Sequence, residues 1–310
     1  MSTVKKIQYN VIFLLMAVAL FASTLPVVAD NSTEAKPAKQ KPLIITTIKP
    51  LAIIAKSAVG DQARVEYLQN AAQSAHDVTL PVSAMIKVEQ AKLVIWIGEG
   101  FEGRIGKSMA LLPEAKRITV MDLDMLPAED KTGNLGTLDK QAVENTDGHH
   151  KNFKFDPHIW LNPANGNILA AVIQARLGLP RTAIISDALV EQLRGELEPI
   201  KDRNYLTHHD AYAHFSSAFD LSRGVSIRDA SGASQGAKSQ YRLRQKAKAT
   251  NAGCILIEPQ YDEKDARIIA RELELPLKSV DSQGFGQPLS ADGYSEFMSG
   301  LVSQFKACFE

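Results

Sequence analysis

The sequence is poor in several features that would place it in other classes of protein. Its 310 residues include only two Cys, too few for a disulfide-dense scaffold or a four-cysteine zinc site. Neither sign of charge is in excess, because 35 Lys and Arg stand against 35 Asp and Glu, so we expect no nucleic-acid partner. A hydrophobic share of 45% argues against wholesale disorder. Any metal chemistry would therefore have to use His and carboxylates.

The first 29 residues have the layout of a secretory signal. Lys5 and Lys6 form a basic start, an apolar run covers residues 11–22, and small residues precede Asp30. A membrane anchor is the alternative, but a spanning helix needs about 20 apolar residues. We therefore expect a cleaved signal over 1–29 and an exported protein, in which the two Cys can form a disulfide.

The rest of the chain predicts a polar tether followed by two α/β units. Residues 30–42 are polar and rich in Pro and Lys, which is typical of a flexible tether. Beyond them, short apolar runs alternate with helix-like stretches, which indicates an α/β fold with parallel sheets. The predicted strands cover residues 43–48, 63–68, 93–97 and 117–121 in the first unit, and 205–207, 224–227, 254–257 and 277–280 in the second.

A helical segment is predicted to join the two units. Residues 164–177 and 186–203 have helical spacing, and Gly178 and Pro180 interrupt them. The expected divisions are an N-terminal α/β lobe over 43–163, a connecting segment over 164–203 and a C-terminal α/β lobe over 204–310.

Three of the seven histidines lie where an α/β lobe presents its binding residues. His76, His158 and His209 are each predicted at a strand end or in a loop. Side chains so far apart in sequence can converge between lobes, and three imidazoles suit zinc well. We expect His208 and His214 to be structural. His214 lies five residues beyond His209 on a predicted helix, so the two side chains should point in different directions.

The segments around these histidines resemble those of a known family. The second and third ligand motifs are matched by DPHIWLNP at 156–163 and HDAY at 209–212, and the first, more loosely, by AHD and LPVS within 75–83. Further matches are AKLVIWIGEGFE at 91–102, IEPQY at 257–261 and YSEF at 294–297. On these residues the chain resembles the periplasmic zinc-binding component of ABC importers, the ZnuA-like metal-binding proteins.

The resemblance implies two α/β lobes with parallel sheets, joined by a long connecting helix, with the metal site in the interlobe cleft. It implies the zinc ligands His76, His158 and His209, with either Asp281 or a water in the fourth position. The family's Pro-Leu after this Asp is replaced here by Ser282-Gln283. Manganese-type relatives have Glu where His209 stands, so a third imidazole favours zinc, although copper(II) would bind imidazoles more tightly still.

Other implications of the resemblance concern residues around the site. It implies a disulfide between Cys254 and Cys308. The stretch between the second and third ligand motifs is shorter than in the family, which leaves the lobe-to-lobe geometry open. In a long loop predicted over 122–152, His149 and His150 could form a weak second zinc site or be ordinary exposed residues. Three Asp residues flank the ligands and could either orient them or cap local turns: Asp77, Asp156 and Asp210.

The predicted function is zinc capture in the periplasm and delivery to an inner-membrane ABC permease. We expect a monomer that catalyses nothing. The main alternative is a secreted zinc hydrolase, because three His and a water also describe a catalytic site. The sequence has no H-E-x-x-H motif and no nucleophile elbow, which favours the binding protein. A metal-binding adhesin on the same fold is a weaker alternative.

Overall fold

The computed structural model describes residues 40–70, 74–125, 156–229, 232–234 and 236–310. The predicted signal, nearly all of the tether, His149 and His150 lie outside these residues. The compact unit described below runs from Lys41 to Glu310. Within its described part, no helix has both the length and the apolar character needed to cross a membrane.

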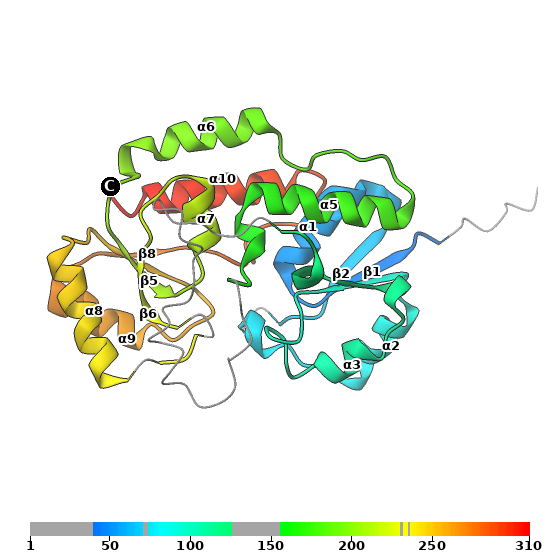
Figure 1. The fold of residues 1–310 in the computed structure, drawn as a ribbon, viewed down its shortest axis with the longest axis horizontal. Coiled ribbons are helices and arrows are strands. Elements are labelled where there is room, and N and C mark those ends of the chain that lie inside the picture. The colour runs from blue at the N-terminus through cyan, green and yellow to red at the C-terminus, as the bar shows by residue number, and fades with distance from the viewer. Residues whose placement is uncertain (1–39, 71–73, 126–155, 230–231, 235) are drawn as a thin grey trace, which may run out of the picture. The chain divides into compact units, whose positions relative to one another are not determined.

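The first lobe is built on a four-stranded parallel sheet with the order β2-β1-β3-β4 (Figure 1). The two inner strands are almost wholly buried, as expected for parallel strands covered on both faces. The strands are β1 (Leu43–Thr46), β2 (Arg64–Tyr67), β3 (Leu93–Trp96) and β4 (Arg117–Thr119). The helices of this lobe are α1 (Lys49–Val59), α2 (Val82–Gln90) and α3 (Gly106–Ala110).

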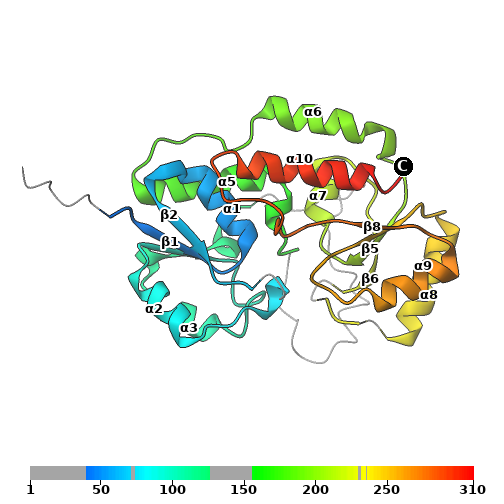
Figure 2. The ribbon, with the colours of Figure 1, turned by 180° about the vertical axis from the view of Figure 1, so that it is seen from behind.

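The second lobe repeats this arrangement with the order β6-β5-β7-β8, again all parallel. Its strands are β5 (Leu206–His209), β6 (Val225–Arg228), β7 (Ile255–Ile257) and β8 (Leu277–Ser279). Its helices are α7 (Ala213–Ala218), α8 (Ala237–Ala249) and α9 (Lys264–Leu273), the last two lying on the outer side of the sheet (Figure 2). All eight predicted strands are found, so the prediction of two α/β lobes is confirmed.

The connection contains two helices where the resemblance implied a single long one. The first, α5 (Pro163–Leu177), starts at Asn162, whose side chain accepts a hydrogen bond from the Ala164 N–H at 2.9 Å. It ends at Gly178, whose φ of 68° is left-handed and costs glycine nothing. The second, α6 (Asp187–Leu197), starts only after Ser186. The predicted break is therefore confirmed, and the expectation of one continuous helix is corrected.

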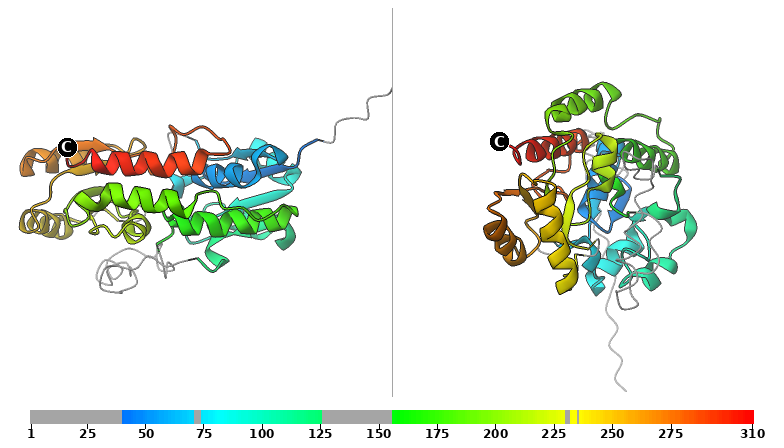
Figure 3. Two further views of the ribbon diagram at one scale, coloured as in Figure 1. Left: turned by 90° about the horizontal axis from the view of Figure 1, so that it is seen from above. Right: turned by 60° about the vertical axis from the view of Figure 1, so that its left-hand side comes forward.

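One hydrophobic core extends through both lobes. One apolar cluster includes Ile95 of β3, Leu256 of β7 and Phe305 of the last helix, α10 (Gly293–Lys306). A second, smaller cluster lies between the second sheet and helices α8 and α9. Figure 3 shows α10, in red, beside α6, and the two helices are in contact. Continuous burial of this kind holds elements from both lobes in one packed unit.

A disulfide attaches the last helix to the second sheet. Cys254 lies directly before β7 and Cys308 follows α10, with their Cα atoms 5.6 Å apart. This separation is normal for a disulfide, and both residues are buried. The expected pairing is confirmed.

Candidate metal centre

The three histidines singled out in the sequence come together. His76 lies in a 3-10 turn after β2, His158 directly before the 3-10 turn that leads into α5, and His209 at the end of β5. One ring nitrogen from each lies within 4.8 Å of those of the other two. Among the described residues, this is the one group of three or more His, Cys, Asp or Glu side chains placed in this way.

The closest pair already has the spacing of two ligands on one zinc ion. Nε2 of His158 and Nε2 of His209 lie 3.3 Å apart. Zinc–imidazole bonds of about 2.0–2.1 Å in a tetrahedron separate two ligand nitrogens by about 3.3–3.4 Å. A metal ion bound by both atoms therefore requires little change in their separation.

Asp156 fixes the orientation of His158. Its Oδ1 accepts hydrogen bonds from the ring Nδ1–H at 2.7 Å and from the backbone N–H of the same histidine at 3.0 Å. Both side chains are buried. Burial opposes the charge of the carboxylate, but its contacts with His158 outweigh burial and lower the pKa of Asp156. The ring thus keeps its proton on Nδ1 and directs the Nε2 lone pair at the other histidines.

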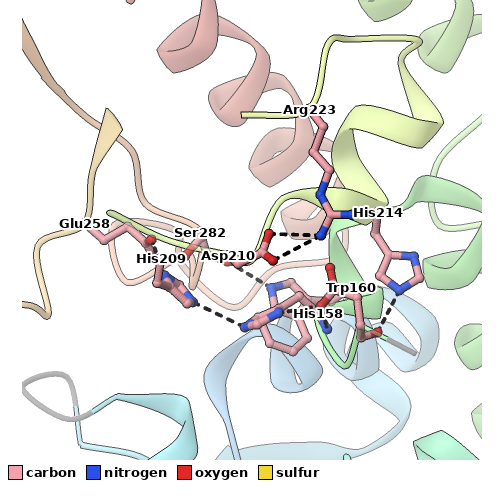
Figure 4. A network of polar contacts seen from close by, with 9 residues as sticks. His158, Trp160, His209, Asp210, His214, Arg223, Glu258 and Ser282 are labelled. Carbon is pink, nitrogen blue, oxygen red and sulfur yellow. Dashed lines mark hydrogen bonds and ion pairs between the residues drawn. The ribbon is translucent and has the colours of Figure 1, made fainter. Parts of the chain in front are cut away.

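Glu258 does the same for His209 (Figure 4). Its Oε1 accepts a hydrogen bond from the ring Nδ1–H at 2.5 Å, and its Oε2 accepts from Ser282 Oγ at 2.5 Å and Gln260 Nε2 at 2.8 Å. The carboxylate is fully buried, which opposes its charge, but the neighbouring His209 lowers the pKa of Glu258 below its ordinary value. Sequence reasoning missed this residue. Glu258 lies within the matched segment IEPQY at 257–261, but it is the pairing of β5 with β7 that brings it against His209.

The hydrogen bonds to these two carboxylates favour binding of a cation between His158 and His209. With both Nδ1 atoms donating to carboxylates, the two Nε2 lone pairs of His158 and His209 face each other across 3.3 Å. Two acceptors this close repel one another unless a proton or a metal ion lies between them. The donor set therefore fits a metal ion that prefers imidazole.

The third histidine is more accessible than the other two. His76 is partly buried, whereas His158 and His209 are both 2% exposed. Its backbone N–H donates to Ser74 Oγ at 3.3 Å, and its ring centroid lies 4.1 Å from that of Phe101. This partner belongs to the segment 91–102, so the matched motif supplies packing for the first of the three histidines.

Aromatic rings surround the histidines. Trp160 lies with its ring centroid 5.1 Å from that of His158, and Tyr261 lies 5.0 Å from His209. Together with Phe101 they exclude water from the buried ring nitrogens, which strengthens every electrostatic interaction there.

Comparison with known proteins identifies the family. The family described as the periplasmic component A of the zinc-uptake complex, ZnuA, matches residues 44–180 and 185–308. The chain belongs to the ZnuA family. A relative from Yersinia pestis, the high-affinity zinc uptake system protein ZnuA, is 28% identical over 291 residues, covering 86% of this chain and 91% of the relative.

Solved structures share the fold of this ZnuA-family chain. The periplasmic zinc-binding protein TroA from Treponema pallidum has a TM-score of 0.69 at 18% identity and covers 87% of this chain and 99% of its own. The laminin-binding protein Lmb of Streptococcus agalactiae, described as bifunctional with adhesin and metal-transporting activity, has a TM-score of 0.66 at 16% identity, with coverages of 87% and 100%. At these identities the matches speak to the fold alone.

Asp281, expected as an alternative fourth ligand in this ZnuA-family member, lies outside the group of three histidines. Its Oδ2 accepts a hydrogen bond from the Gly286 N–H at 2.8 Å, and its own N–H donates to Gln304 Oε1 at 2.9 Å. The first contact closes the turn after β8 and the second reaches α10, so Asp281 has structural partners, and its role as a fourth ligand stays a prediction.

The other flanking residues have separate partners. Asp77 pairs with Arg104 at 3.4 Å and Asp210 pairs with Arg223 at 3.0 Å, so of the three flanking Asp residues Asp156 is the one found on a histidine of the group. His214 Nε2–H donates to the Asp156 carbonyl at 2.9 Å, behind His158. The remaining neighbour, His208, is buried against Tyr261, and burial lowers its pKa to about 4. The structural roles expected for both histidines agree with these contacts.

Proposed function

We propose that this protein captures zinc in the periplasm and delivers it to an ABC permease of the inner membrane. The observation that carries the proposal is the convergence of three imidazoles, two of them oriented by buried carboxylates. The zinc-uptake role in the name of the Yersinia pestis relative supports the direction of transport. The export signal predicted over residues 1–29 supports the compartment.

The donor set favours zinc among the divalent metals. Three neutral imidazoles suit zinc, while manganese prefers sites richer in carboxylate oxygen. The fourth donor in this proposal is a water, since Asp281 lies outside the group of three histidines and its Oδ2 accepts from the Gly286 N–H. Zinc is the cargo here, so the site has to release it as well as bind it.

The geometry supports binding over hydrolysis. A zinc hydrolase needs a general base close to the metal-bound water. The two buried carboxylates beside the histidines, Asp156 and Glu258, each accept from an Nδ1–H, on the side of the ring away from the Nε2 atoms that face each other. Such a carboxylate serves to hold a ligand in place and is poorly placed to accept a proton from a substrate.

Calorimetric titration of the mature chain, residues 30–310, with zinc and with manganese tests the proposal. We expect one tightly bound zinc per chain, weaker manganese binding, and no hydrolysis of ester or peptide substrates. The variant His158→Ala should lose most of the zinc affinity. The control His214→Ala should keep it, because this side chain contacts the Asp156 carbonyl and not a ligand ring. Full zinc affinity in His158→Ala would disprove the proposed site.

A further inference from the structure

A short segment after β8 contacts both lobes beside the histidines. It covers residues 281–286. On the side of the second lobe, the Asp281 N–H donates to Gln304 Oε1 at 2.9 Å. On the side of the first lobe, Lys49 Nζ, from the start of α1, donates to the Phe285 carbonyl at 2.8 Å. The segment is therefore held in place from two directions.

Ser282 is the residue of this segment that reaches the ligands. It is 2% exposed. Its Oγ donates to Glu258 Oε2 at 2.5 Å, and its carbonyl accepts a hydrogen bond from Trp160 Nε1 at 2.9 Å (Figure 4). One end of the serine thus binds the carboxylate that holds His209, and the other binds the indole that packs on His158.

Each of these contacts restricts one ligand. Ser282 Oγ and Gln260 Nε2 both donate to Glu258 Oε2, which fixes the plane of the carboxylate and leaves Oε1 for the Nδ1–H of His209. A fixed carboxylate fixes the tautomer and the direction of the ring that it binds. The Trp160 ring, held through its N–H, limits the rotation of the neighbouring ligand ring.

We propose that Ser282 is a positioning residue for zinc binding, which ties the orientation of His209 to that of His158. This inference depends on the proposed function, because the atoms being positioned are the zinc ligands. It also depends on a feature of this chain's own sequence. A proline at position 282, as in the motif that the chain resembles, would have no hydroxyl to offer Glu258.

The variant Ser282→Ala tests the role of the hydroxyl while leaving the backbone carbonyl in place. Zinc affinity, measured by competition against a chelator of known affinity, should fall about 10-fold, the lower end of the range for residues that act on a ligand from outside. Ser282→Thr keeps the hydroxyl and should stay within about 3-fold of the wild type. Ser216→Ala is the matched control, because it removes another buried serine hydroxyl of the same lobe, bonded to Tyr205.

Two further measurements separate positioning from a general structural effect. If the serine acts through Glu258, the loss caused by Ser282→Ala should largely disappear in a Glu258→Gln background, as in a double-mutant cycle. In metal-free protein labelled with ¹⁵N-histidine, the Nδ1–H resonance of His209 should shift in Ser282→Ala. It should stay in place in Ser216→Ala.

The outcomes distinguish this inference from the proposed function. The inference is overturned if Ser282→Ala matches Ser216→Ala in affinity and spectrum, or if the effects of Ser282→Ala and Glu258→Gln simply add. In either case a wild-type chain that binds zinc leaves the proposed function standing. A wild-type chain that binds no zinc overturns the proposed function and the inference together.

Discussion

The two lobes share one strand order, yet each buries a glutamate in a different way. Glu258 of the second lobe lies against His209, and this partner lowers its pKa. Glu102 of the first lobe accepts hydrogen bonds from the Ile97 N–H at 2.7 Å and the Gly98 N–H at 3.3 Å, and burial raises its pKa to about 7. Both carboxylates are fully buried. The second lobe uses its buried charge to hold a ligand, and the first uses its own to hold a turn.

This difference extends to the ligands themselves. His209 stands on a strand, is 2% exposed and is oriented by a buried carboxylate. His76 stands on a 3-10 turn, is only partly buried and packs on Phe101. Its ring centroid is also farther from those of His158 and His209, at 5.5 and 6.3 Å, than those two are from each other, at 5.1 Å. His158 and His209, each oriented by a buried carboxylate, therefore form the rigid half of the site, and His76 forms the adjustable half.

The largest expected effect comes from deleting one ligand in each half. Structural zinc sites bind with about 10–16 kcal/mol shared among four donors, so each ligand is worth roughly 100- to 1,000-fold in affinity. We expect His209→Ala to lose about 1,000-fold and His76→Ala about 100-fold, because the preorganised ligand contributes more. Competition titration measures both losses.

A second readout separates the two variants without metal. His209→Ala leaves Glu258 buried without its partner, which should reduce the free energy of unfolding by about 3 kcal/mol. His76→Ala should cost about 1 kcal/mol or less. Equal losses in affinity and in unfolding free energy for the two variants would contradict the division into rigid and adjustable halves.

Much of this frame follows from the sequence, because its signals are local. Continuous apolar runs mark buried parallel strands, and Gly178 and Pro180 mark the break between α5 and α6. The three histidines that converge stand out by their neighbours in the chain. The role of Glu258 could not be predicted in this way, because it depends on β7 lying next to β5 in the sheet.

The same limit applies to residues that look alike in the sequence. Asp156 and Asp210 both flank a ligand histidine, but Asp156 bonds His158 while Asp210 pairs with Arg223, 13 residues further along. Asp281 matches a motif, yet its Oδ2 accepts a hydrogen bond from a turn N–H and it lies outside the group of three histidines. Such choices depend on which donor the folded chain brings within 3 Å, and spacing along the chain does not contain that information.

The disulfide provides the next test of the difference between the lobes. Among the described residues, the disulfide between Cys254 and Cys308 lies in the second lobe. The double variant Cys254→Ala/Cys308→Ala opens a loop with a sequence separation of 54, which should cost up to about 4 kcal/mol of unfolding free energy. Urea unfolding measures this cost. Zinc stoichiometry should remain one, because neither sulfur belongs to the histidine group. A lost zinc site would show that the rigid half depends on the covalent link.

Glu102 gives a smaller effect with a defined pH dependence. Its pKa rises from 4.5 to about 7 on folding, so its contribution to stability is complete below about pH 4.5 and is lost as pH rises through about 7. The shift corresponds to about 3 kcal/mol. The variant Glu102→Gln should therefore gain about 3 kcal/mol relative to the wild type between pH 4.5 and pH 8. Urea unfolding at a series of pH values measures the gain.

The exposed neighbour Glu99 supplies the control for this pH series. Glu99→Gln should track the wild type at every pH, because it makes the same chemical change at an exposed position and removes no buried carboxylate. A pH-independent difference between Glu102→Gln and the wild type would mean that the first lobe holds its buried glutamate charged, as the second lobe does.

The smallest effect concerns the connection that sets the two lobes beside each other. Gly178 ends α5 with a left-handed φ of 68°, and Gly195 lies within α6; a Cβ added at either would meet no atom within 4 Å. Gly178→Ala should therefore lose about 1 kcal/mol through its backbone alone, while Gly195→Ala should gain about 0.5–1 kcal/mol from better helix propensity. Thermal unfolding of the two variants measures both changes in stability, which should have opposite signs. If both variants were stabilised, α5 would be able to continue past Gly178, and the connection would be closer to the single long helix that the family resemblance implied.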